Sequence, residues 1–393
     1  MGIIDGYAGG DFRPQGTLTR QAAAKIIACM ILGKTTAESL GTSAAPFKDV
    51  PAGSSFAGYI AFCVERGLID GYADGTFRPT GTLTGFAFLK MLLGALGYDS
   101  SIEGYTGPNW TVNVAGRAYE IGLTAGNDEF VGAQACTREQ AALYAVNTLK
   151  TTLVEYTDRG SEITVNGAVI STAASVPTYV TSSVYNQATS INADRDNSGD
   201  YTVEFAERYQ PDLTMDRDTD DFGRPSYTWA WKNRDIGTYV DYSLMVAEYT
   251  TGVSGRELYN VLTASTIRNA DLDVYVDGVE PDEADTIDKS DLSRSNQDDV
   301  GVTDNGVLTQ VFVDTDANDG DGLITIASIN TWLAQATANY SESKEYAPLK
   351  VFTGKGGANT TYNVDVEDVA NVADVADEAF YLVNISYKDS NLS

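Results

Sequence analysis

The chain has 393 residues, of which 55 are acidic and 26 basic, so its formal net charge is −29. A charge of this sign argues against nucleic acid and anionic membranes as partners. The sequence contains no histidine, which excludes Ser-His-Asp and Cys-His catalysis and zinc sites with imidazole ligands.

The charge is unevenly distributed along the chain. Residues 1–155 carry 11 basic and 14 acidic side chains, a net charge of −3, whereas the remainder carries 15 and 41, a net charge of −26. This asymmetry predicts two functionally different parts. Three cysteines, Cys29, Cys63 and Cys136, match no metal-ligand spacing and are predicted to be buried free thiols.

A repeat dominates the first part. The segments GIIDGYAGGDFRPQGTLTR (2–20) and GLIDGYADGTFRPTGTLTG (67–85) agree almost residue for residue at an offset of 65. Apolar residues at helical spacing follow each segment, so each predicts an amphipathic helix. A diverged third copy precedes a helix that begins after Thr137. All three helices open on a threonine, a good N-cap, and Thr137 with Gln140 forms a capping-box pattern.

Each copy is predicted to be a helix–loop–helix unit. The preceding helix is visible in copy two near 56–66 and in copy three near 112–121. Copy one lacks it, because the chain begins inside what is a repeat unit elsewhere. Both ends of the sequence look truncated, so we expect the absence of a signal peptide to carry no information about localisation. No stretch approaches the length of a membrane-spanning helix.

These residues resemble S-layer homology domains, the wall-anchoring modules of bacterial surface proteins. The resemblance covers about residues 1–150 and is carried by FKDV at 47–50, the duplicated loops at 2–14 and 67–79, and the TRQ and TRE sequences that open two helices. It implies a helical module of three repeats with pseudo-threefold symmetry. It also implies binding of a secondary cell-wall polysaccharide, often pyruvylated, in grooves between the repeats.

The resemblance implies a role in anion recognition for the arginine that follows the threonine cap, which here is Arg20 or Arg138. The candidate polymer-binding residues are therefore Arg20, Arg138, Thr19, Thr137, Asp70 and Tyr72. An arginine at a helix N-terminus is a reasonable anion contact on physical grounds too, because free amides and the helix dipole favour negative charge there. Copy two has Gly85 at this position, so we expect its groove to have lost the anion contact.

Other loop residues admit two interpretations. Aspartates such as Asp70 bind a cation or sugar hydroxyls, or else form local turn hydrogen bonds. Tyr7 and Tyr72 stack on a sugar ring or fill the core between repeats. Arg13 and Arg78 contact ligand or form structural pairs at the repeat junctions.

After about Glu155 the sequence predicts antiparallel strands, because β-branched and aromatic residues alternate with polar ones between turn signals. Predicted strands lie at 162–170, 201–205, 272–278, 308–314, 323–329, 360–366 and 380–387. A capping box at Ser254 and Glu257 predicts one helix, and TWLAQATANY after Asn330 suggests another.

One acidic loop, 314–322, is the local pattern that best suggests a metal site. Asp314, Asp316, Asp319 and Asp321 offer oxygen ligands suited to calcium as a cofactor, although the spacing fits an EF-hand poorly. The alternative is a solvated hairpin turn.

The sequence therefore predicts a multidomain α + β protein. Its N-terminal part would be an all-α module of S-layer homology repeats and its C-terminal part mostly antiparallel β with a few helices. The predicted domains are 1–153 (repeats 1–45, 46–104 and 105–153), 154–290 and 300–393. The predicted function is a non-enzymatic, extracellular bacterial surface protein that binds wall polysaccharide, associates with itself in a lattice, and neither binds nucleic acid nor inserts into membranes. The alternatives are a wall-anchored glycan-active enzyme and an adhesin.

Overall fold

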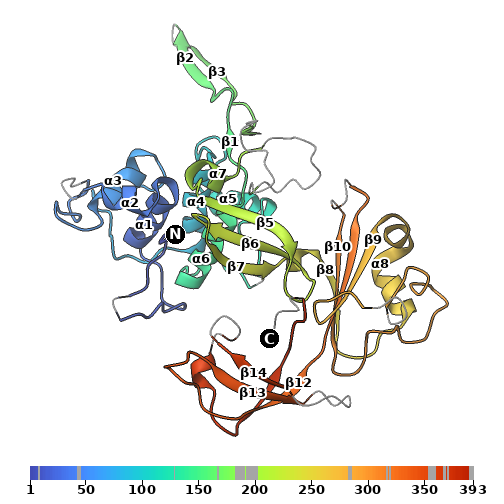
Figure 1. Ribbon diagram of the computed structural model, residues 1–393. Helices are drawn as coiled ribbons and strands as arrows, with labels where there is room; N and C mark the ends of the chain where they lie inside the picture. Colours follow the sequence, from blue (N-terminus) through green and yellow to red (C-terminus); the bar gives the residue numbers. More distant parts are fainter. Residues whose placement is uncertain are drawn as a thin grey trace. The chain divides into compact units, whose positions relative to one another are not determined.

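The computed structural model describes residues 1–7, 9–41, 46–127, 129–165, 168–181, 191, 202–281, 286–315, 317, 320–352, 360–365, 369 and 371–388. The chain forms two compact units (Figure 1). The first comprises 1–194, 198–216 and 229–236, and the second comprises the remaining residues. The predicted boundaries at 153, 290 and 300 stay predictions.

The first unit is mainly helical. Its helices are α1 (Arg20–Leu32), α2 (Lys34–Glu38), α3 (Ala57–Glu65), α4 (Gly85–Leu96), α5 (Trp110–Glu120), α6 (Arg138–Leu149) and α7 (Phe205–Tyr209). All five helices expected in the repeats are confirmed. The hydroxyls of Thr19, Thr84 and Thr137 accept hydrogen bonds from amides of the first turns, and the Thr137–Gln140 capping box is present. The short α2 was not predicted, because five residues are too few to show a helical period.

The segments that precede α1, α4 and α6 are joined in a closed ring of backbone hydrogen bonds. The amide of Leu18 donates to the carbonyl of Cys136 at 2.8 Å, that of Cys136 to Leu83 at 2.9 Å, and that of Leu83 to Leu18 at 2.9 Å. All three side chains are buried. Each copy of the repeat is thus bonded to both of the others.

A second junction of three segments follows α6. The amide of Leu153 donates to Val203, that of Val203 to Val180, and that of Val180 to Leu153. Strands β1 (Val154–Glu155) and β4 (Thr178–Tyr179) pair beside this junction, and β2 (Ser161–Val165) pairs with β3 (Ala168–Thr172) in a hairpin that extends away from the helices (Figure 1). The strand expected at 201–205 is wrong: Thr202 and Glu204 form only isolated bridges, with Thr181 and Thr152, and α7 begins at Phe205.

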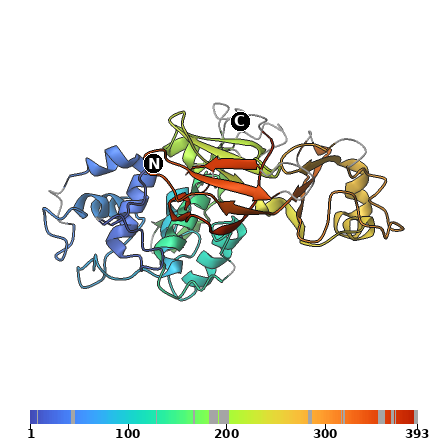
Figure 2. The same cartoon turned by 60° about the horizontal axis from the view of Figure 1, so that its bottom comes forward.

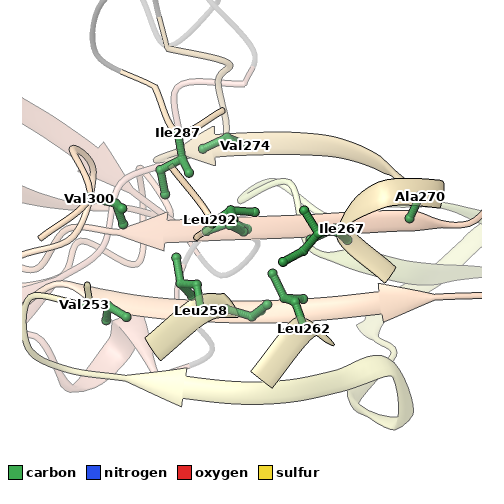
Figure 3. Packing of buried hydrophobic residues seen from close by; sticks show 12 residues of the cluster. Val253, Leu258, Leu262, Ile267, Ala270, Val274, Ile287, Leu292 and Val300 are labelled. Atoms are coloured by element: carbon green, nitrogen blue, oxygen red, sulfur yellow. The ribbon is translucent and has the colours of Figure 1, made fainter. Parts of the chain in front are cut away.

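The second unit contains two four-stranded sheets. One has the order β8 (Met245–Tyr249), β10 (Leu308–Asp314), β11 (Leu323–Ile329), β9 (Asp271–Val276), and only its β11–β9 pair is parallel. The predicted helix α8 (Gly255–Asn269) covers this sheet, and its Leu258 and Leu262 join the buried cluster (Figure 3). The 3-10 helix η1 (Tyr242–Leu244) precedes β8.

The other sheet is antiparallel throughout, with the order β14 (Thr360–Val364), β13 (Ala347–Phe352), β12 (Trp332–Ala336), β15 (Phe380–Val383) (Figure 2). The 3-10 helix η4 (Val372–Asp374) packs on it through Val372. A further sheet, β5 (Leu213–Thr219), β6 (Pro225–Trp231) and β7 (Asp235–Val240), contributes residues to both units. A mixed fold of helices and mostly antiparallel sheets is therefore confirmed.

The helix suggested after Asn330 is wrong. These residues form β12, which lies between β13 and β15. Ala334 and Ala336 are buried on one face and Leu333 is exposed on the other, so burial follows the period of two that a strand has. Tertiary pairing has overridden a local sequence that favours a helix.

Candidate functional site

Arg20 and Arg138 are equivalent buried arginines at the first position of α1 and α6. Each is only 9% exposed. Nε of Arg20 donates to the carbonyl of Phe77 at 2.7 Å and Nη2 donates to that of Asp70 at 2.6 Å. Nε of Arg138 donates to the carbonyl of Phe12 at 2.9 Å and Nη2 donates to that of Asp5 at 2.7 Å.

Each arginine therefore braces the loop of another copy. Arg20 comes from copy one but holds the loop of copy two, and Arg138 comes from copy three but holds the loop of copy one. The acceptors match at the repeat offset of 65, as do the aromatic contacts. The Arg20 guanidinium carbon lies 5.0 Å from the ring centre of Tyr72, and that of Arg138 lies 4.9 Å from the ring centre of Tyr7.

A second arginine contacts each of these tyrosines. The guanidinium carbon of Arg13 lies 4.4 Å from the Tyr7 ring centre, and that of Arg78 lies 3.9 Å from the Tyr72 ring centre. Arg13 also pairs with Asp11 and Arg78 with Asp74, at 3.3 and 3.2 Å. These are the contacts that a structural role for Arg13 and Arg78 requires.

The FKDV motif also has a structural role that the sequence did not reveal. The carboxylate of Asp49 accepts hydrogen bonds from the amides of Phe77 and Arg78, both at 2.7 Å. Arg78 has a positive φ of 56°, a backbone conformation that non-glycine residues seldom adopt. Asp49 therefore stabilises the turn at Phe77 and Arg78. Arg20 donates to a carbonyl of this same turn, that of Phe77.

A pocket of about 280 Å³ opens beside Arg20. It brings together the cations Arg20 and Lys90, the exposed acid Asp70 and the ring of Trp110; the remaining lining residues are Leu68, Ile69, Leu83, Ala87, Met91, Tyr105 and Thr106. The Lys90 ammonium lies 6.0 Å from the Trp110 ring centre. Among the described residues it forms no ion pair, so it is available to an anionic ligand.

The pocket unites two of the predicted site residues, Arg20 and Asp70. Thr19 and Thr137 cap α1 and α6. Arg138 lies in the equivalent junction, between α6 of copy three and the loop of copy one. Sequence reasoning missed Lys90 and Trp110 as site residues. The sequence offered one signal for Lys90, because Lys25 occupies the corresponding position in copy one at an offset of 65. A lysine that recurs on an otherwise apolar helix is expected to have similar surroundings in both copies.

The copy-one counterpart of this pocket is electrostatically different. Lys25 bonds the carboxylate of Asp5 at 2.6 Å, and Lys34 bonds the same carboxylate at 3.2 Å. The hydrogen bond from Lys25 holds the pKa of Asp5 below its usual value, although partial burial opposes this. The positive charge of Lys25 is therefore already neutralised within the protein.

Gly85 faces a filled space. A Cβ added there would lie 3.0 Å from Cε2 of Phe130 and 3.2 Å from Cα of Gly132. Phe130 packs edge-on against Phe86 and Tyr144. The junction that lacks the arginine is thus closed by an aromatic side chain.

The predicted calcium loop lies partly outside the described residues. Asp316 and Asp319 are not described. Asp314 ends β10 opposite Leu323 of β11, and Asp321 lies in the connection between these strands. The part of the chain that the structure describes contains no cluster of three candidate metal ligands. Calcium binding here stays a prediction.

Comparison with known proteins identifies the repeats. The model of the S-layer homology domain matches residues 1–24 and 46–89. A surface layer protein of Brevibacillus choshinensis is 24% identical over 168 residues, which are 42% of this chain and 14% of that protein. A cellulosome-anchoring protein of Acetivibrio thermocellus is 37% identical over 82 residues, 21% of this chain and 18% of that protein.

An enzyme is similar as well. An endoglucanase of Bacillus sp. strain KSM-635 is 36% identical over 110 residues, 27% of this chain and 12% of that protein. The chain thus spans less than a fifth of the length of each of these relatives. No helix among the described residues is long and apolar enough to span a membrane.

Proposed function

We propose that this chain, a bacterial cell-surface protein with S-layer homology repeats, is anchored by binding an anionic wall polysaccharide at the junctions between its repeats. The closed ring of hydrogen bonds through Leu18, Leu83 and Cys136 supports a pseudo-threefold arrangement of the three copies. The names of the surface layer and cellulosome-anchoring relatives support the wall as the location of the ligand.

The Arg20–Lys90–Trp110 pocket is the observation that carries this proposal. Two cations suit a carboxylate such as that of a pyruvylated sugar, and an indole ring suits the apolar face of a sugar. Nε and Nη2 of Arg20 bond to carbonyls, whereas Nη1 has no partner among the described residues. Arg20 therefore combines bracing of the loop with a nitrogen that is free for ligand, and Lys90 is the stronger candidate for a pure ligand contact.

The test is binding of Lys90→Ala to purified wall sacculi, with and without their secondary polymer. A charge-assisted contact is worth about 1.5–3 kcal/mol, so the variant should bind about 10- to 150-fold more weakly than the unmodified chain. The matched control is Lys25→Ala, which removes the equivalent lysine from copy one, where Asp5 already neutralises it. Equal binding of both variants, or equal binding to stripped and intact sacculi, would rule out this pocket.

The acidic, strand-rich part is proposed to face outward, as a lattice-forming or surface-presenting region without enzymatic activity. Calcium-dependent formation of sheets, seen by electron microscopy, would support the lattice.

The endoglucanase relative keeps one other function open, that of a wall-anchored enzyme acting on glycans. Release of reducing ends from a panel of polysaccharides would establish that function instead.

A further inference from the structure

Two glutamates are buried side by side where the chain leaves the second three-segment junction. Glu204, the N-cap of α7, is 0% exposed, and Glu207, in the first turn, is 6% exposed. They form a reciprocal capping box, in which each side chain accepts the other residue's amide. Oε1 of Glu204 also accepts from the hydroxyl of Thr152 at 3.0 Å, and Glu207 accepts from the amide of Ile191 at 3.1 Å.

One oxygen of this pair lacks a donor. Oε2 of Glu204 is buried and has no hydrogen-bond partner among the described residues. The side chain of Glu207 lies within hydrogen-bonding reach, but an ionised carboxylate has no proton to donate. Two buried ionised carboxylates at this separation would repel each other without a compensating cation. A proton on either group removes the repulsion and supplies the missing donor.

Among the described residues, no cation bonds the pair, and Arg208, the basic residue of α7 itself, is exposed. Hydroxyls and backbone amides are the groups that bond the pair from the segments around it. Of the titratable residues on the helices packed against α7, Cys29 of α1 and Tyr144 of α6 are buried and neutral, and Lys150 after α6 is exposed. Burial, followed by the neighbouring Glu204, raises the pKa of Glu207 to about 8.

The pair lies at the attachment of α7 to the repeat helices. Directly after α7, Nε2 of Gln210 donates to the carbonyls of Cys29 and Met30, at 3.1 and 2.7 Å, at the C-terminal end of α1. The amide of Phe205 donates to the carbonyl of Thr151, just beyond α6. α7 therefore fastens two repeat helices to one another, and the carboxyl pair forms its first turn.

We propose that Glu207 is protonated and donates this proton to Oε2 of Glu204, and that losing it as the pH rises loosens the attachment of α7 to α1 and α6. The folded pair holds a proton that the unfolded chain gives up near the ordinary carboxyl pKa. The stabilisation is therefore complete below the unfolded value of about 4.5, falls as pH rises, and is fully lost above about 8. The attachment of α7 to α1 and α6 is therefore sensitive to pH, and it is separate from the pocket beside Arg20.

Hydrogen exchange at the α7 amides of the full chain tests this inference. Glu207→Gln is the informative variant, because its amide group can accept from the Glu204 amide and donate permanently to Glu204 Oε2, as the protonated acid does. Between pH 5 and pH 9, protection of these amides in the unmodified chain should fall by about tenfold or more relative to the variant. Glu257→Gln is the matched control, because Glu257 has the same capping-box position in α8 but is exposed to water.

Parallel protection profiles for the unmodified chain and Glu207→Gln would overturn the proposal. If Glu207→Gln fails to fold, Glu204→Gln must show the same loss of pH dependence.

Discussion

Replacing Arg20 by alanine tests whether this side chain braces the repeats or serves the ligand alone. The substitution removes two hydrogen bonds from a charged donor, at 2.7 and 2.6 Å, each worth about 1.5–3 kcal/mol. It also removes contacts with the rings of Tyr72 and Phe77, worth about 0.5–1 kcal/mol. Burial lowers the pKa of Arg20, because the charged guanidinium loses hydration in the folded chain. This loss of hydration offsets part of the stabilisation from its contacts. We therefore expect the lower part of the range, a loss of about 3–4 kcal/mol in the free energy of unfolding.

Urea unfolding followed by the helical circular dichroism signal measures this loss, because most helices belong to the first unit. Arg13→Ala is the control, since Arg13 also contacts a loop tyrosine but its side chain is 60% exposed; it should cost less than about 1 kcal/mol. The bracing argument would be refuted if Arg20→Ala were as stable as Arg13→Ala while its binding to sacculi fell tenfold or more. That result would make Arg20 a ligand contact alone.

Two further predictions concern the cores of the repeats. Gly85→Ala should destabilise the chain by about 1–3 kcal/mol, because the new Cβ meets Phe130 and Gly132; Gly116→Ala, in the middle of α5 with no atom within 4 Å, should instead stabilise it by about 0.5–1 kcal/mol. Thermal unfolding of both variants would measure this, and two equal shifts would contradict it. All three cysteine thiols should resist alkylation at pH 8 until denaturant is added, because they are buried and burial raises the pKa of Cys63 and of Cys136 to about 12. Rapid labelling of any thiol in the native chain would argue against its place in the core.

The helical repeats could be predicted from the sequence because their signals are local. Apolar spacing and the threonine caps depend only on residues within one or two turns, and the duplication at an offset of 65 supplied an independent check. The β12 segment shows the opposite case. Its Ala and Gln residues favour a helix, and only its place between β13 and β15 makes it a strand.

The candidate site was predicted only in part, for the same reason. The position of Arg20 at a helix N-terminus is local, whereas its acceptors lie 50 and 57 residues further along the chain. The partner loop of each arginine depends on how the copies are arranged, and no periodicity encodes that. Trp110 and Lys90 likewise come together only through packing of α5 against α4.

The closed ring of Leu18, Leu83 and Cys136 constrains how this module can evolve. In an open stack of repeats, a further copy can be added at either end, and the binding surface then lengthens. Here the main-chain amide and carbonyl of each of these three residues bond to the other two, so a fourth copy has no place to join. The number of junctions between copies is therefore limited to three. The proposed polymer binding can then diversify only by change within a junction, and the three junctions already differ at Arg20, Arg138 and Gly85.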